Sequence, residues 1–166
     1  MANSATEDML SLAVVIGGHP ITGFAASGAI RFDQDQPAFG KRNGVGGLGS
    51  FFRVIDDSGT LSIDLLPTSD SNDVLNAFLA FAKSRPNGAN YAVSVIDTTG
   101  RDSLICGSCA ITKNPARTWG DGTGINTWDL IGVQWVITTG GRGATPVFDI
   151  SEVPGIADIP GIRNAA

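Results

Sequence analysis

The sequence predicts a mainly β fold with one α-helix laid against the β core. Residues Thr60–Leu65 alternate, with Leu61, Ile63 and Leu65 on one face and polar residues on the other, as in a half-buried strand. The segment Val74–Ala82 instead places its apolar residues at the three-to-four spacing of a helix. Twenty-two glycines and only two methionines in 166 residues are typical of turns and strands rather than of a helical bundle.

The remaining elements follow in chain order. Strands are expected over Leu12–Ile16, Ile30–Asp35, Phe51–Ile55, Thr60–Leu65, Tyr91–Asp97, Ser103–Thr112 and Asn126–Thr138. Turn residues separate several of them, at Gly17–Pro20, at Asp56–Gly59 and at Thr98–Gly100. Pro67 ends the strand before the helix, because it lacks the amide donor that a strand ladder needs. The Ser69–Ser71 cluster is expected to cap the first turn, and Pro86 with Gly88 to end the helix.

Two segments lack a hydrophobic period. Phe39–Ser50 is glycine-rich and is predicted to be an extended loop between strands. Gly140–Ala166 is rich in proline, glycine and alanine, and is predicted to be an arm that orders on a partner. The chain is therefore divided into one domain, residues 1–139, and a C-terminal extension, residues 140–166.

Composition and charge exclude several classes of function. The net charge of −5 argues against tight nucleic-acid binding, which needs clustered cations. The N-terminus is polar and acidic where a secretory signal is basic, and the run Leu10–Ile16 is too short to span a bilayer. A soluble protein made in a cytoplasm is expected. Only 16% of residues are charged, which is low for a free monomer and favours a surface hidden against copies of itself.

One glycine motif and one cysteine motif match known patterns of cofactor or metal binding. Gly44–Gly49 fits the glycine spacing of dinucleotide-binding turns, but a β-prone segment follows where that motif needs a helix N-terminus. Cys106 and Cys109 have the spacing of redox and zinc motifs, but residues three apart on a regular strand face opposite sides of a sheet. We therefore interpret the first as a loop and the second as two packed side chains, with no cofactor and no metal.

The other chemically capable residues favour no reaction. His19 precedes a proline in a predicted turn, and no nucleophile–base arrangement can be built around it. The pairs Asp33 with Asp35 and Asp56 with Asp57 are expected on solvated surface. The three tryptophans, which could stack on a sugar or a base, are expected in a core or an interface: Trp119, Trp128 and Trp135. No catalytic residue is predicted, and the protein is not expected to be an enzyme.

Several segments, in this order and spacing, resemble the tail tube proteins of contractile-tailed bacteriophages. They are Ile21-Thr-Gly-Phe24, Leu61–Leu79 with its helix start at Thr68–Leu75, Ile111-Thr-Lys-Asn-Pro115, and Asn126-Thr-Trp-Asp-Leu130. The resemblance covers roughly Leu12–Ile137. The extension Gly140–Ala166 and the cysteine pair depart from it.

The resemblance implies a tail-tube-like β-barrel or sandwich related to type VI secretion tube proteins. It implies a structural virion protein, with homo-hexameric rings stacked into a tube for genome delivery. Its partners would be tail sheath, tape-measure and baseplate proteins, with double-stranded DNA passing transiently and without specific binding. The protein would be assembled in the host cytoplasm and reside in the phage tail. Two alternatives remain: the tube protein of a contractile bacteriocin or similar injection machine, or a small ligand-binding or redox β-barrel.

Residues are assigned to two roles within such a tube. The lumen-lining candidates lie on the polar faces of two predicted strands, where carboxylates would repel DNA phosphates: Asp33, Asp35 and Asp64. An ordinary outer surface is the alternative for this face. The ring-stacking candidates lie in the glycine-rich segment, which cannot stabilise itself: Gly40, Lys41, Arg42, Gly44, Gly46, Gly47 and Gly49.

Overall fold

The computed structural model describes residues 12–26, 29–98, 102–117 and 124–139, which form one helix and ten strands. The helix α1 is Ser71–Ser84. The strands are β1 Leu12–Ile16, β2 His19–Ile21, β3 Ile30–Gln34, β4 Phe39–Asn43, β5 Gly49–Arg53, β6 Gly59–Leu65, β7 Tyr91–Asp97, β8 Ser103–Ile111, β9 Asn126–Gly132 and β10 Trp135–Thr138. The predicted C-terminal arm, residues 140–166, lies outside the described residues.

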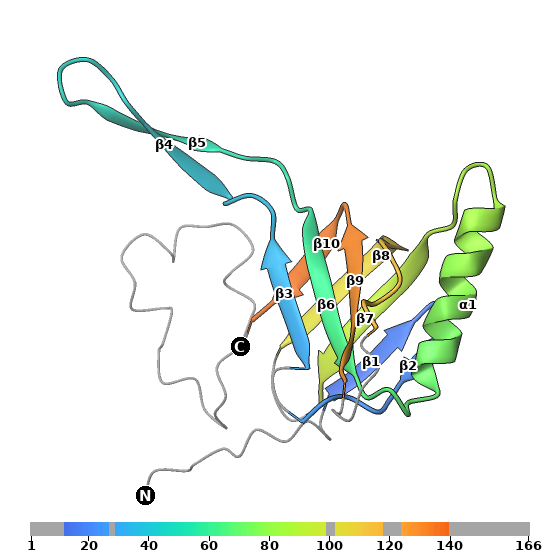
Figure 1. Cartoon of the computed structure of the whole chain (residues 1–166). Coiled ribbons are helices and arrows are strands. Elements are labelled where there is room, and N and C mark those ends of the chain that lie inside the picture. The colour runs from blue at the N-terminus through green and yellow to red at the C-terminus, as the bar shows by residue number, and fades with distance from the viewer. Residues whose placement is uncertain (1–11, 27–28, 99–101, 118–123, 140–166) are drawn as a thin grey trace, which may run out of the picture.

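Eight of the strands form one antiparallel sheet in the order β2-β1-β7-β8-β9-β6-β3, with β10 also paired to β8. The strand β8 holds the sheet together, because its first half pairs with β10 and its last three residues pair with β9. The sheet curves but is not closed into a barrel (Figure 1). The predicted fold class, mainly β with one helix, is confirmed as a sandwich-like form.

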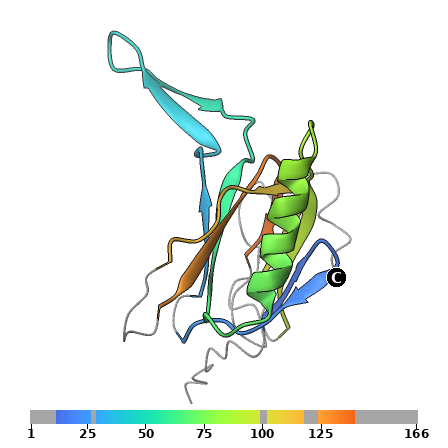
Figure 2. The same ribbon diagram turned by 45° about the vertical axis from the view of Figure 1, so that its right-hand side comes forward.

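The core lies between the inner face of this sheet and α1 (Figure 2). Leu61, Ile63 and Leu65 of β6 are fully buried, as the alternation of that strand predicts. From the helix, Leu75 and Leu79 pack into the same cluster. Burial of such side chains contributes about 1.5–3 kcal/mol each, so this contact fixes α1 on the sheet.

The Ser69–Ser71 cluster caps the first turn in part, as predicted, and also makes contacts that the sequence did not predict. The residue at the N-cap position, Asp70, makes no side-chain cap hydrogen bond. Instead, Ser69 Oγ donates to the carbonyl of Thr22 at 2.6 Å, and the amide of Thr22 donates to Ser71 Oγ at 2.9 Å. The cluster therefore ties the start of the helix to the segment after β2. Ser69 Oγ also accepts the amide of Ser71 at 3.3 Å, which satisfies one free amide of the first turn.

Two strand assignments change. The turn predicted at Gly17–Pro20 is tighter, since β2 already begins at His19 and pairs with β1. The single strand predicted over Asn126–Thr138 is two, β9 and β10, interrupted at Val133–Gln134. The register along β8 is unchanged across this interruption, because Gly132 of β9 pairs with Cys109 and Trp135 of β10 pairs with Cys106.

The extended loop predicted over Phe39–Ser50 is extended but paired. The strands β4 and β5 form a separate two-stranded hairpin that projects away from the main sheet (Figure 1). Its tip is a glycine turn in which the amide of Gly44 donates to the carbonyl of Leu48 at 2.8 Å. Gly46 and Gly47 have φ values of 105° and 82° there, a conformation that side chains disfavour.

Candidate assembly surfaces

The outer face of β3, β6 and β9, opposite the core, carries a polar cluster. The register brings Arg31, Ser62 and Asp129 into one row across the three strands. Two residues further along β6, Asp64 lies opposite Thr127 of β9. Because side chains on neighbouring strands in register lie about 5 Å apart, these residues can bond directly.

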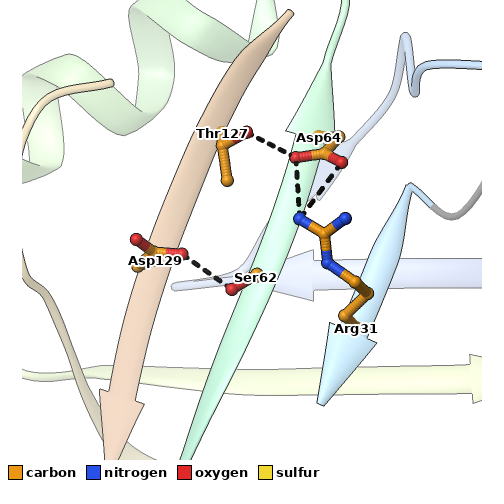
Figure 3. Close-up of polar contacts among 5 residues, drawn as sticks. All are labelled: Arg31, Ser62, Asp64, Thr127 and Asp129. Atoms are coloured by element: carbon orange, nitrogen blue, oxygen red, sulfur yellow. Dashed lines mark hydrogen bonds and ion pairs between the residues drawn. The ribbon is translucent and has the colours of Figure 1, made fainter. Parts of the chain in front are cut away.

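Asp64 is the centre of this polar cluster (Figure 3). Its side chain forms an ion pair with Arg31, with Nη2–Oδ2 at 3.3 Å, and accepts a hydrogen bond from Thr127 Oγ1 at 2.6 Å. Beside it, Ser62 Oγ donates to Asp129 Oδ1 at 2.7 Å. Asp64 is only 7% exposed, so its charge is held within the subunit and compensated.

The three lumen-lining candidates are therefore not equivalent. Asp33 on β3 and Asp35 just beyond it are exposed, on the same side of the strand as Arg31. Asp64 belongs to the same face but lies beneath Arg31. Asp129 and Thr127, which also belong to this cluster, were not predicted from the sequence. The alternation of Asn126–Leu130, which buries Trp128 and Leu130, was the signal that could have identified them.

The hairpin β4–β5 is the second surface, and it exposes large apolar side chains. Phe39 and Phe51, on one face of the ribbon, are 66% and 79% exposed. Others in or beside the hairpin are also exposed, namely Val45, Leu48, Phe52 and Ile55. An isolated two-stranded hairpin is marginally stable in water. Contacts with another surface would therefore stabilise this hairpin.

Gly40 leaves room for a side chain of the neighbouring strand, and its φ is not in the left-handed region. Gly40 is paired with Phe52, whose ring lies across it. A Cβ atom added at Gly40 would collide with that ring. The guanidinium of Arg42 lies 5.9 Å from the centre of the same ring, within cation–π range. The ring-stacking candidates Gly40 and Arg42 thus belong to one packed face of the ribbon.

The charge of the hairpin is opposite to that of the rest of the chain. Residues 38–55 contain three cations, Lys41, Arg42 and Arg53, and no acidic residue. Without these three, the net charge of −5 becomes −8. The hairpin is therefore a cationic and apolar projection on an otherwise acidic protein.

The cysteine pair corrects the sequence argument about strand faces. Cys106 and Cys109 are both buried, each 1% exposed, and both belong to the core cluster. A bulge places them on the same face: β7 advances two residues, Tyr91 to Val93, where β8 advances three. Burial raises the pKa of the Cys109 thiol, and the neighbouring thiol of Cys106 raises it further. The interpretation as packing residues agrees with this burial, although its geometric reason was wrong.

The other motifs are also located. The dinucleotide-like glycines form the hairpin tip, and a strand follows them as expected. His19 lies on β2 with its ring 5.5 Å from that of Phe78. Trp128 and Trp135 are buried in the core, as predicted, and Trp119 lies outside the described residues.

Two further findings concern the described part of the chain. It contains no group of three or more His, Cys, Asp or Glu side chains placed to hold a metal ion. Nor does it contain a helix long and apolar enough to cross a membrane.

Comparison with known proteins relates this fold to contractile injection systems. No protein-family model and no curated protein sequence matches the chain. The cryo-EM structure of the anti-feeding prophage cap, a tube-terminating cap, shares the fold with a TM-score of 0.53 and 12% identity, over 84% of this chain and 95% of that one. A chain of the PVC sheath–tube complex, from an extracellular contractile injection system in the extended state, has a TM-score of 0.53 and 10% identity, over 82% and 93%. The fold is thus tube-like, a β-sandwich with a helix.

Proposed function

We propose that this chain is a tube subunit of a contractile tail or injection machine, with a structural rather than a catalytic role. The observation that carries the proposal is the β4–β5 hairpin, whose exposed phenylalanines and three cations project from an otherwise acidic protein. Such a surface is costly in a free monomer and useful in a head-to-tail assembly. The similarity of fold to a tube-terminating cap and to a sheath–tube complex supports it.

The assembly would consist of homo-hexameric rings stacked into a tube. The hairpin would contact the next ring through the stacking residues Gly40, Lys41, Arg42, Gly44, Gly46, Gly47 and Gly49. The glycines keep the ribbon thin and shape its tip, while the two cations approach the acidic surface of a neighbouring copy. The C-terminal extension, residues 140–166, would follow the tube domain 1–139 as an additional segment.

The polar face of β3, β6 and β9 would line the lumen. Asp33 and Asp35 would then present carboxylates to the channel, while Asp64 would hold Arg31 in place beside them. An acidic wall repels phosphates, so double-stranded DNA would pass without sticking. The expected partners are sheath, tape-measure and baseplate proteins. The expected setting is a phage virion assembled in the host cytoplasm, or else a bacteriocin-like injection machine.

Negative-stain microscopy of the purified full-length protein, together with its mass in solution, tests the proposal. Hexameric rings or stacked tubes are expected. A stable monomer at high concentration would refute self-assembly and favour a small binding module. The matched control is the variant Phe39→Ser with Phe51→Ser, which removes the apolar part of one hairpin face and should shift the protein from tubes to rings or monomers.

A tube terminator is the second candidate, because one structure of the same fold is a tube-terminating cap. A terminator forms one ring and stops, whereas a tube subunit stacks indefinitely. The length of the particles in the same micrographs distinguishes them, since a terminator would give single rings even at high concentration.

A further inference from the structure

The outer face of the sheet changes from polar to apolar between β3 and β7. On β7, β8, β9 and β10 it carries a group of branched aliphatic side chains, here named the apolar strip. The apolar strip consists of Ile96 (43% exposed), Ile105 (44%), Ile131 (49%) and Val136 (65%). Their neighbours along the strands, such as Leu104 and Trp135, are buried in the core, so the strip faces away from it.

The register of the sheet makes three of these side chains adjacent. Val136 on β10 lies directly opposite Ile105 on β8. Ile96 on β7 is diagonal to Ile105, because the pairs are Ser94 with Ile105 and Ile96 with Ser103. Direct partners have Cβ atoms about 5 Å apart and diagonal ones about 7–8 Å, so the three lie within reach of one another, with the small side chains of Ser94 and Ser103 beside them on the same face.

The chain itself supplies a segment that fits this surface. Residues 140–166, which the structure does not describe, begin two residues after the end of β10, the strand that carries Val136. They contain seven large apolar residues and five charged ones. Four of the apolar residues occur in two short repeats six residues apart, Val153-Pro-Gly-Ile156 and Ile159-Pro-Gly-Ile162. A chain of this composition has more apolar surface than a segment that stays solvated.

We propose that residues 147–162 dock on the apolar strip of their own chain. The prolines exclude a continuous helix and favour an extended course, in which the two aliphatic pairs contact successive strands. The segment is long enough, since 27 residues can span about 90 Å whereas the three strands are spaced about 5 Å apart. Attachment at β10 also gives the segment a millimolar effective concentration at the strip, which a second copy lacks in dilute solution. The inference does not depend on the proposed function.

Photo-crosslinking of the full chain tests the proposal. The variant Ile105→p-benzoylphenylalanine places a reactive apolar side chain in the strip, and irradiation should link it to a peptide within residues 147–162. A mixture of isotopically light and heavy protein identifies the donor chain, and at least nine-tenths of the crosslinks should join two light or two heavy segments. Mixed pairs would show docking between copies, and absence of the crosslink would show an open strip. Either result overturns the proposal.

Two matched variants separate docking from accidental reaction. The variant Asp33→p-benzoylphenylalanine puts the same group on the polar half of the same outer face, and should give no crosslink to residues 147–162. Changing Ile156→Ser and Ile162→Ser in the Ile105 photo-variant should reduce the crosslink at least tenfold while the near-ultraviolet circular dichroism of the core stays unchanged. A crosslink of equal yield in either variant would contradict the proposal.

Discussion

Trp128 of β9 donates a hydrogen bond from Nε1 to Oδ1 of Asn72, at the start of α1, over 3.0 Å. Both residues are buried, at 1% and 7% exposure. The same Asn72 oxygen accepts from Asn126 Nδ2 at 3.1 Å, while its own amide group donates to the carbonyls of Leu66 and Ser69. One side chain thus joins the end of β6, the helix start and β9. Two segments far apart in the sequence, Leu61–Leu79 and Asn126–Leu130, therefore meet at this point.

The first prediction is that Asn72→Ala destabilises the subunit by roughly 2–3 kcal/mol. The substitution leaves the buried indole N–H of Trp128 without its acceptor, and an unsatisfied buried group costs about 1–3 kcal/mol in addition to the lost bonds. Urea unfolding followed by tryptophan fluorescence measures the effect. Asn76→Ala, an exposed position on the same helix, is the control and should stay within about 0.5 kcal/mol of the wild type. Equal effects of the two substitutions would contradict the assigned role of Asn72.

The sequence predicts the main sheet and α1 well, because their burial follows simple periods. Leu61, Ile63 and Leu65 are all fully buried, and the helix buries Leu75 and Leu79 as the spacing requires. Asn72 could not be found in this way. Its role depends on β9, which is 54 residues away, and no local pattern reports a long-range hydrogen bond.

The hairpin and the arrangement of the two cysteines were not predicted from the sequence, for other reasons. The strand β4 and the tip of the β4–β5 hairpin have no hydrophobic period because neither face packs on the core, so they were predicted as a loop, whereas Phe51–Ile55 was expected as a strand. The cysteine pair was placed on opposite faces because the bulge in β8 arises from its pairing with β7, which the spacing of Cys106 and Cys109 does not encode. Asp64 was correctly placed on the polar face, but its ion pair with Arg31 depends on the register of β3 and β6.

The second prediction concerns the hairpin. Deleting Gly40–Gly49 should leave a folded subunit, because this segment belongs to a sheet of its own, but should stop tube growth. The single change Gly40→Val should have a similar but weaker effect, since its side chain displaces the ring of Phe52. Circular dichroism measures folding, and electron microscopy measures tube length. Normal tubes from the deletion variant would show that the hairpin does not mediate stacking.

The third prediction concerns the thiols. Burial raises the pKa of Cys109, so less of it is thiolate at pH 8 than in a free cysteine, and its reaction with a disulfide reagent should be slow. Two thiols should react rapidly only after denaturation. The double variant Cys106→Ser with Cys109→Ala should cost on the order of 1–2 kcal/mol and still assemble. If the wild type instead lost assembly on treatment with a chelator or a reductant, and zinc or an oxidant restored it, the thiols would have a metal or redox role.

The last prediction concerns the acidic face. Changing Asp33→Lys and Asp35→Lys should leave assembly intact, because both side chains are exposed. If they line the lumen, the four-unit charge change per subunit should make assembled tubes retain duplex DNA at low salt, and DNA should pass more slowly.

Asp64→Lys is unsuitable in the same variant and serves as the contrast. It would place a second cation beside Arg31 in a nearly buried site, so it should lower stability rather than alter DNA retention. Fluorescence anisotropy of labelled duplex DNA, measured with assembled tubes at 20 mM and about 150 mM salt, distinguishes the two effects, because screening weakens exposed charges about one Debye length apart. Variant tubes that retain no more DNA than the wild type at low salt would place Asp33 and Asp35 on the outer surface.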